Sequence, residues 1–257
     1  MNDKCSMLIQ KRDFLVENIN ILSKEILENY EDDFEINFIH DSTAIEGNTL
    51  TLKETKLLLE DKISVGSKDL REIYEVVNHK KAWTYVKSLA KNGCDLDEKI
   101  IKKIHKILME NIIEGGKGRE GGEYRDVDVR ITGAKHSLPN PFIAKIELEE
   151  FFKTLKNNNF NIIELATYTH AEFVRIHPFS DGNGRVSRII MNYQLIKNNF
   201  LPISIKTKDK SIYYDVLEEY AINNNINPFV EMIYELEEKQ LDFYLNALNY
   251  EMNNDKV

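Results

Sequence analysis

Apolar residues recur along most of the chain at the spacing of one helix face. In residues 8–30, for example, Leu15, Ile19, Leu22 and Ile26 follow one another at intervals of three or four, which predicts an amphipathic helix. Comparable patterns predict further helices over residues 34–47, 51–59, 69–91, 98–112, 143–157, 162–177, 184–198, 208–220 and 228–248.

Polar residues support two of the helix starts. Thr51 stands three positions before Glu54, which is the spacing of a capping box, and Asp95 stands three positions before Glu98 in the same way. The polar tail 249–257 is expected to fray. There is no internal repeat and no low-complexity linker.

One segment departs from the helical pattern. Residues 114–141 hold six of the eleven glycines and two of the five prolines. Within the segment, Val127, Val129 and Ile131 alternate with polar residues, and period-two alternation between glycine-rich turns predicts a short β-hairpin or extended flap. The expected fold class is therefore mainly α, with one small β element near the middle of the chain.

Composition narrows the function classes. The 257 residues are 42% hydrophobic and 30% charged, with a net charge of −9, which is typical of a globular protein and a poor match to nucleic acid or an anionic membrane surface. Cys5 and Cys94 have no partner at metal-binding spacing, so neither a zinc site nor a disulfide framework is indicated. Without a visible signal peptide or apolar span, the expected location is cytoplasmic.

The tight turn Gly182-Asn183-Gly184 immediately precedes a helical pattern. Glycine lets backbone N–H groups approach a ligand, and a helix start offers unpaired donors and a partial positive charge. The turn therefore predicts an anion site, most often for phosphate. Arg185 and Arg188 follow at i and i+3, on one helix face, and guanidinium groups bind phosphate in a bidentate manner.

Two residues before the turn add further chemistry. Asp181 would lie beside a bound polyphosphate, where a carboxylate is a natural Mg²⁺ ligand. His177, at the end of the preceding helical pattern, is a candidate general base because free imidazole has a pKa of about 6.5. A base, a metal ligand, an anion cradle and two arginines within twelve residues indicate phosphoryl or nucleotidyl transfer.

From His177 to Arg188 the sequence resembles the signature H-P-F-x-[DE]-G-N-G-R-x-x-R of the Fic (filamentation induced by cAMP) domain family at every specified position. Residues 122–125 and 129–139 resemble the family's flap, which holds the target segment, and residues 201–203 and 213–214 resemble the segment after the motif helix. The resemblance implies a Fic-fold helical bundle with a short β-hairpin flap.

The implied activity is that of a protein adenylyltransferase, which moves AMP from ATP to a Ser, Thr or Tyr hydroxyl of a target protein or of itself. His177 would take the hydroxyl proton, Asp181 would hold Mg²⁺, residues 182–184 would cradle the phosphates, and Arg185 with Arg188 would bind the β- and γ-phosphates. The implied nucleotide-binding residues are Asp181, Gly182, Asn183, Gly184, Arg185, Val186, Ser187, Arg188, Tyr213 and Tyr214, the tyrosines near the base. The implied target contacts are Val129, Ile131, Thr132 and Gly133 in the flap.

A second motif lies at residues 42–47. Its residues match the family's inhibitory pattern [ST]-x-x-x-E-[GN], although alone they also suit an ordinary helix end capped by Gly47. The resemblance implies that Glu46 pairs with Arg188 and so blocks the γ-phosphate, while Ser42 ties the same helix to the pocket. The expected organisation is an N-terminal region with the inhibitory helix (1–92), a Fic core (93–205) and C-terminal helices packed on it (206–257).

Several alternatives stay open at this point. The scaffold could transfer the γ-phosphate, use another nucleotide, remove AMP again, or act as a catalytically silent nucleotide-gated binding module. The target and the oligomeric state are not encoded in any motif, and a homo-oligomer is compatible with the sequence. Outside the motif, His136 reads as a solvated loop residue, His170 as a packing residue, and His40, His79 and His105 as ordinary helix residues.

Overall fold

The fold is arranged around one central helix, α8 (Asn183–Lys197), which follows the glycine turn. This computed structural model describes residues 2–63, 66–112 and 121–254, and the regular structure in those ranges is entirely helical. The other elements are α1 (Asn2–Asn18), η1 (Ile19–Ile21), α2 (Lys24–Ile45), α3 (Leu52–Lys56), η2 (Leu57–Asp61), α4 (Leu70–Lys91), α5 (Glu98–Leu108), α6 (Pro141–Lys156), α7 (Ile162–Ile176), η3 (Thr207–Asp209), α9 (Lys210–Asn223) and α10 (Asn227–Asn254).

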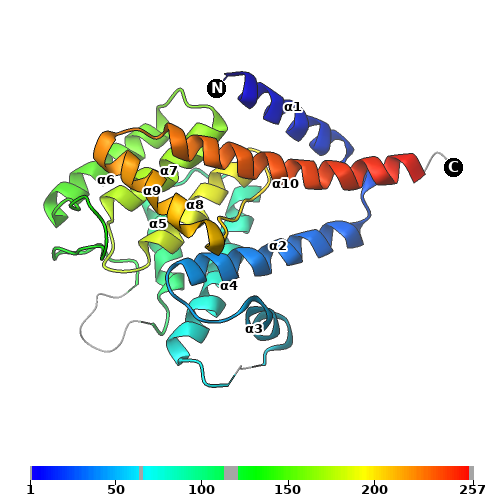
Figure 1. Cartoon of the computed structure of the whole chain (residues 1–257). Coiled ribbons are helices and arrows are strands. Elements are labelled where there is room, and N and C mark those ends of the chain that lie inside the picture. Colours follow the sequence, from blue (N-terminus) through cyan, green and yellow to red (C-terminus); the bar gives the residue numbers. More distant parts are fainter. Residues whose placement is uncertain (1, 64–65, 113–120, 255–257) are drawn as a thin grey trace.

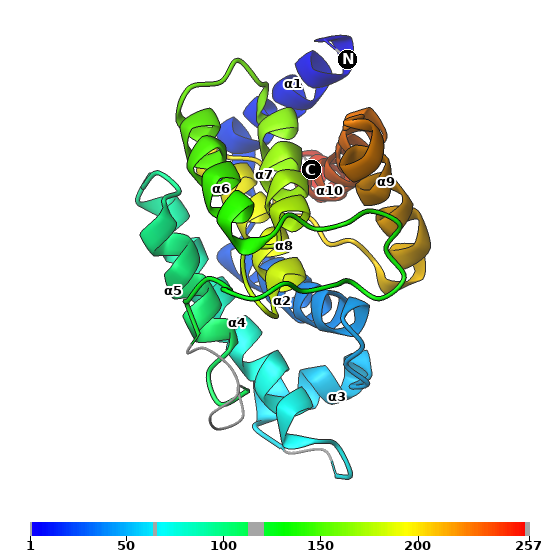
Figure 2. The same ribbon diagram turned by 90° about the vertical axis from the view of Figure 1, so that its left-hand side faces the viewer.

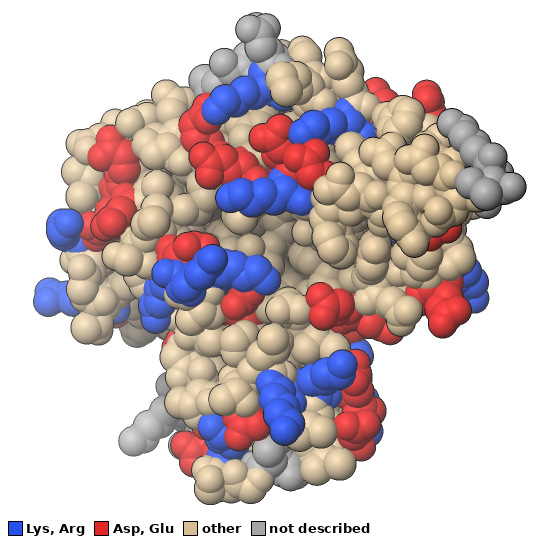
Figure 3. Space-filling view, turned by 45° about the vertical axis from the view of Figure 1, so that its right-hand side comes forward, with Lys and Arg blue, Asp and Glu red and all other residues tan. Residues whose placement is uncertain are grey.

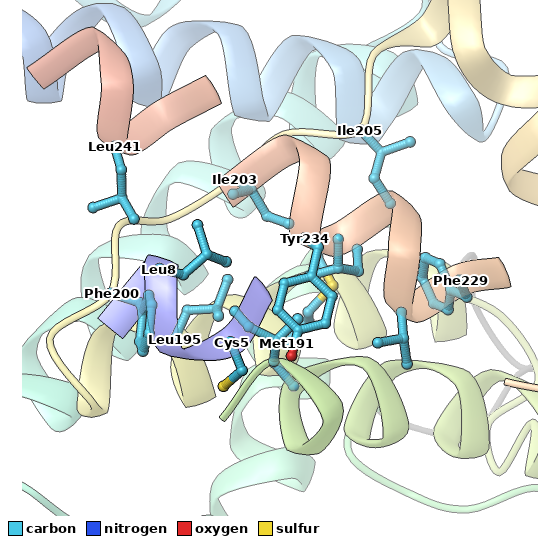
Figure 4. Close-up of a cluster of buried hydrophobic side chains, with 14 of the residues drawn as sticks. Cys5, Leu8, Met191, Leu195, Phe200, Ile203, Ile205, Phe229, Tyr234 and Leu241 are labelled. Atoms are coloured by element: carbon cyan, nitrogen blue, oxygen red, sulfur yellow. The ribbon is translucent and has the colours of Figure 1, made fainter. Parts of the chain in front are cut away.

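Helix α8 is buried because it contributes to two hydrophobic clusters. Met191 and Leu195 pack with residues of α1, α7, α9 and α10, a cluster that Figure 4 shows in close-up. Val186, Ile189 and Tyr193 pack with residues of α4, α5, α6 and α7 in the second cluster. The two cores hold the N-terminal end of α8, which carries the glycine turn, in a fixed position.

The first predicted helix, 8–30, is wrong in its bounds. The chain breaks after α1 because Leu22 is extended and Ser23 caps α2, its hydroxyl accepting the N–H of Ile26. Helix α2 then runs without interruption to Ile45, so the predicted break between residues 30 and 34 does not occur. As a result, the inhibitory motif lies at the C-terminal end of a helix of 22 residues.

Most other predicted helices are present within a few residues of their expected bounds. Thr51 and Glu54 form the predicted capping box, whereas the cap of α5 is Asp97 rather than Asp95. Helix α10 continues through the tail that was expected to fray, as far as Asn254, and the rings of Phe243 and Tyr30 pack 4.7 Å apart along it.

The predicted β-hairpin is not confirmed, because residues 121–140 contain no strand, and the glycines at 115, 116 and 118 lie outside the described residues. The segment is a long loop that crosses the molecule from the α5 side to α9 (Figure 2). Val129 and Ile131 are half-buried while Arg130 and Thr132 are exposed, but Val127 is exposed, so the predicted alternation holds only over residues 129–132 and without a paired strand. An extended segment needs a neighbouring strand to complete a ladder, and the described chain supplies none here.

The surface has mixed charge. On the face in Figure 3, acidic and basic side chains are interspersed. Ion pairs between the two kinds include Lys11 with Glu238 and Lys81 with Glu110. Cys5 is buried, Cys94 is partly buried, and both are free thiols. Among the described helices, none has both the length and the apolar content that crossing a bilayer requires.

Candidate active site

His177 directly follows α7 and turns the chain into the loop. Its φ of 52° is in the left-handed region, which is uncommon for a residue with a side chain. Its Nδ1 lies 3.3 Å from the carbonyl oxygen of Val174, so Nδ1 carries the proton and Nε2 presents a free lone pair. Burial, together with the charge of Arg125, lowers the pKa of His177 to about 4. The imidazole is therefore neutral near pH 7 and able to accept a proton.

Arg125 braces this strained turn. Its Nε donates to the carbonyl oxygen of His177 at 2.7 Å, and its backbone N–H donates to that of Pro178 at 2.9 Å. The remaining guanidinium nitrogens donate to the carbonyl oxygens of Val127 and Pro139. One buried arginine thus ties both ends of the flap to the catalytic loop.

The interior of the loop is held by Asn183 and Phe179. The Asn183 side chain accepts the N–H of Phe179 at 3.0 Å and donates to its carbonyl oxygen at 2.8 Å. The Phe179 ring is fully buried and stacks on His105 with 3.7 Å between ring centroids. His105 accepts the N–H of Gly122 and lies 3.0 Å from the carbonyl oxygen of Asp181. The Asn183 side chain therefore shapes the loop, and only its backbone is free to contact phosphate.

The glycine turn leaves room for an anion at the start of α8. Gly182 has a φ of 79° and is the N-cap, so the next N–H groups have no partner within the helix. A Cβ built on Gly184 would lie 2.2 Å from Oε1 of Glu46. The Glu46 carboxylate thus occupies the space beside the helix start that a phosphate would need.

Arg185 and Asp181 belong to a network that reaches α4. The Asp181 carboxylate accepts from Arg185 at 3.2 Å and from Arg71 at 2.7 Å, and Arg185 lies 3.3 Å from Glu75. Burial raises the pKa of Asp181, but Arg185, the N–H of Gly182 and Arg71 together lower it below its ordinary value. Asp181 is thus ionised at neutral pH, as a metal ligand must be.

Arg188 is buried and faces α2. Its Nη2 donates to Oε1 of Glu46 at 2.7 Å and to the carbonyl oxygen of Ser42 at 2.7 Å, while its Nε donates to the Ser42 hydroxyl at 2.9 Å. On the other side, its Nη1 donates to the hydroxyl of Tyr213 at 3.3 Å. The two sequence motifs, 142 positions apart, meet at this guanidinium.

The remaining predicted nucleotide-binding side chains lie in less accessible places. Val186 is fully buried in the core, and the Ser187 hydroxyl donates to the carbonyl oxygen of Gly184 at 2.7 Å. Tyr213 is buried behind Arg188, whereas Tyr214 is partly exposed and its hydroxyl donates to the carbonyl oxygen of Ile45 at 3.3 Å. In the flap, Gly133 has a φ of 88° and follows the half-buried Ile131 in a turn closed by Ala134.

Sequence reasoning missed several residues that touch this site. Three of them, Arg71, Glu75 and His79, recur every four residues on one face of α4, but the many other polar residues of this helix hide the stripe. His105 and His170 were interpreted as ordinary or packing residues, yet both form hydrogen bonds within the site. Arg125 was noted only as part of the flap.

The residues present fit a nucleotide and Mg²⁺. The Nε group of Arg185 is buried and donates no hydrogen bond to any described residue, whereas Nη1 forms an ion pair with Glu75 at 3.3 Å, so Nε is the donor of this guanidinium that is left for a phosphate. The described residues contain no group of three or more His, Cys, Asp or Glu that could hold a metal by itself. A single exposed carboxylate such as Asp181 suits Mg²⁺, because this ion is usually held by one or two carboxylates with phosphate oxygens and water.

Comparison with known proteins identifies relatives of this site. The family model described as Fic/DOC family matches residues 95–195. A curated relative from Aedes aegypti, protein adenylyltransferase Fic, is 34% identical over 93% of this chain and 47% of its own length. The chain thus spans about half the length of the curated relatives it matches.

Solved structures share the arrangement of helices. A Fic domain containing signaling protein from Bacteroides thetaiotaomicron superimposes with a TM-score of 0.82 at 26% identity, covering 96% of this chain and 97% of that one. Fic-1 from C. elegans superimposes with a TM-score of 0.84 at 23% identity, covering 97% of this chain and 73% of that one, and it supports the fold alone.

Proposed function

Residues 95–195 belong to the Fic/DOC family, and from this membership we propose that the chain is a protein adenylyltransferase that is autoinhibited by Glu46. It transfers AMP from ATP to a Ser, Thr or Tyr hydroxyl of a target protein or of itself. The observation that carries the proposal is the meeting of His177, Asp181, the start of α8 and two buried arginines in one site. The domain bounds at 92/93 and 205/206 and the cytoplasmic location stay predictions.

In the proposed reaction, Nε2 of His177 takes the proton of the target hydroxyl. The oxygen forms a bond to the α-phosphorus of ATP as the bond to pyrophosphate breaks. The N–H groups at the start of α8, with Arg185 and Arg188, bind the phosphates and stabilise the charge that develops. Asp181 would hold Mg²⁺, which neutralises charge on the phosphates when bound.

The loop at residues 126–140 is the proposed target-binding flap. Val129 and Ile131 lie before a turn at Thr132 and Gly133, and a target segment could pair with the backbone of this loop as an added strand. Such pairing would depend little on the side chains of the target. Automodification and self-association are both compatible with this mode of binding.

Autoinhibition follows from the position of Glu46. Its carboxylate pairs with Arg188 and lies beside Gly184, so it competes with a phosphate for one cation and for one space. We expect Glu46→Gly to raise AMP transfer, because the variant frees both the Arg188 guanidinium and the space beside Gly184 for a phosphate. Glu28→Gly makes the same change at an exposed position of α2 and should leave transfer unchanged.

The test is intact-mass measurement after incubation with ATP and Mg²⁺, for the wild type, Glu46→Gly, Glu28→Gly and His177→Ala. An AMP adduct should be largest in Glu46→Gly and absent in His177→Ala. Label on the α-phosphate should transfer, and label on the γ-phosphate should not. Transfer of the γ label would instead identify a phosphotransferase, and no adduct in Glu46→Gly would favour a silent nucleotide-binding module.

A further inference from the structure

Two buried histidines approach Arg188 from opposite sides, each through a hydroxyl group that also contacts the guanidinium, and Nε2 of His170 lies 3.2 Å from a second hydroxyl, that of Ser187. Nε2 of His79 lies 2.8 Å from the Ser42 hydroxyl, and Nε2 of His170 lies 2.9 Å from the Tyr213 hydroxyl. Both hydroxyls accept hydrogen bonds from Arg188. Each hydroxyl oxygen accepts from Arg188 and still has its own proton to donate. In the tautomer with the ring proton on Nδ1, both imidazoles accept that proton at Nε2.

Acceptance at Nε2 requires neutral rings with the proton on Nδ1. Both rings are fully buried, and burial, with the charge of Arg188, lowers the pKa of His79 to about 3 and that of His170 well below its ordinary value. The Nδ1 atom of each ring has no hydrogen-bond partner among the described residues. An unpartnered buried N–H is unfavourable, so a purely packing role would be served better by an apolar side chain.

The two imidazole–hydroxyl pairs differ in what they hold. Ser42 is on α2, the helix that carries Glu46, so the His79–Ser42 pair binds Arg188 to the inhibitory element. Tyr213 is on α9 and His170 is on α7, the helix that ends at His177, so the second pair binds Arg188 to the catalytic core. If Glu46 gives way to a phosphate, the second pair can remain as it is.

We infer that His79 and His170 are positioning residues for Arg188 with opposite effects on the enzyme. His79, through Ser42, stabilises the arrangement in which Arg188 faces Glu46. His170, through Tyr213, holds the guanidinium in the pose that receives the γ-phosphate. This inference rests on the proposed function for its catalytic consequence, but its effect on nucleotide binding does not depend on transfer.

The variants are His79→Leu and His170→Leu, which remove the ring nitrogens at similar volume, with His79→Gln and His170→Gln, which keep an acceptor near the Nε2 position. Each is made in the wild type and in Glu46→Gly. The readouts are the KM for ATP and kcat of automodification or target labelling, and the Kd of ATP by titration calorimetry. Thermal melting shows whether each variant is folded.

We expect His79→Leu to raise transfer and tighten ATP binding by about two- to tenfold in the wild type, the range for one hydrogen bond, and to change little in Glu46→Gly. We expect His170→Leu to raise the KM and Kd for ATP by a similar factor in both backgrounds, with a smaller effect on kcat. The Gln variants should restore most of each change.

Equal effects of the two Leu variants, or a His79→Leu gain that persists undiminished in Glu46→Gly, would overturn the inference. If a Leu variant fails to fold, the folded Gln variant and Tyr213→Phe test the positioning roles instead. Tyr213→Phe deletes only the hydroxyl, and it must weaken ATP binding as His170→Leu would. If Glu46→Gly transfers no AMP, the proposed function is lost, yet the opposite changes in the Kd of ATP would still support the positioning roles.

Discussion

At the scale of single residues, the decisive feature is the buried guanidinium of Arg188, for which Glu46 and a phosphate of ATP would compete. Arg188 is 2% exposed, and a buried guanidinium needs a partner because its desolvation is unfavourable. In this structure the partner is Glu46, and in the proposed enzyme ATP must replace it. Arg185 differs, since its Nε donates no hydrogen bond to any described residue, while its Nη1 and Nη2 pair with Glu75 and Asp181.

The proton-accepting role of His177 predicts a pH profile. Because the pKa of His177 is lowered to about 4, its base form is present above that value and is lost as the pH falls through it. We expect kcat/KM of Glu46→Gly, which reports the pKa of the free enzyme, to be nearly constant from pH 8 to about pH 5.5. Initial rates across this range, with circular dichroism as a folding control, test the expectation. An inflection near the ordinary imidazole pKa would contradict it.

Arg71 predicts an effect on metal binding, because its Nη2 bonds the same carboxylate that would hold Mg²⁺. Arg71→Ala removes this competitor and should tighten Mn²⁺ binding, measured by electron paramagnetic resonance, by up to about fivefold, the factor for an exposed ion pair. The matched control is Lys81→Ala. Lys81 is on α4, like Arg71, and this change breaks a similar exposed ion pair, with Glu110. Weaker Mn²⁺ binding in Arg71→Ala would mean that the arginine supports the metal site.

At the scale of elements, α2 carries Glu46, and in the proposed enzyme its position decides whether the site is open. Its C-terminal end is held by Asp41, which accepts from the Ser204 and Thr207 hydroxyls and pairs with Lys206. Burial raises the pKa of Asp41, but these partners with His40 lower it to about 2, so the carboxylate stays charged over the range where the protein is folded. Asp41 thus tethers α2 to residues 204–207, and it lies one residue before Ser42.

Asp41→Asn should therefore loosen α2. Since the lowered pKa reflects interactions with the ionised carboxylate, we expect the free energy of unfolding to fall by about 2 kcal/mol and AMP transfer to rise. Hydrogen exchange over residues 36–45 should become faster in the same variant. Asp33→Asn, at an exposed position of α2, serves as the control, and an unchanged exchange rate in Asp41→Asn would show that the tether is not needed.

At the scale of the whole molecule, the two hydrophobic clusters on either side of α8 fix the site to the bundle, and one acid lies inside them. Glu237 of α10 is fully buried, and its only hydrogen bond among the described residues is with the N–H of Leu201 at 3.0 Å. Burial raises the pKa of Glu237 to about 8. The folded protein therefore keeps this group protonated where the unfolded chain would ionise it.

This linkage gives a stability prediction with a definite sign. Between its unfolded pKa of about 4.5 and its folded pKa of about 8, Glu237 makes the protein less stable as the pH rises. Glu237→Gln keeps an acceptor for Leu201 and should raise the free energy of unfolding by about 3 kcal/mol at pH 7, and by less than about 1 kcal/mol at pH 5. Urea unfolding at both pH values measures the difference. Glu235→Gln, two residues away on the exposed side of α10, should show no such pH dependence.

The sequence by itself determined the helical class, most helix bounds and the catalytic loop, because these depend on local spacing and on a contiguous motif. Periodicity predicted α4, α7 and α8 to within two residues, and the residues from His177 to Arg188 indicated the chemistry. The sequence could not decide where α1 ends and α2 begins, because that depends on packing against distant parts of the chain. It also could not show that the flap has no strand among the described residues, because strand pairing needs a distant partner.

Only the tertiary structure decided which side chains share the site. Arg71, His79 and His170 come from helices whose own patterns make them look like ordinary buried or surface residues. Contacts such as that of Glu46 with Arg188 join residues far apart in sequence, and the energy of a charge or hydrogen bond depends on burial and distance after folding. The motif names the groups that can react, whereas the packing of α2, α4 and α9 around α8 sets which of them Arg188 faces.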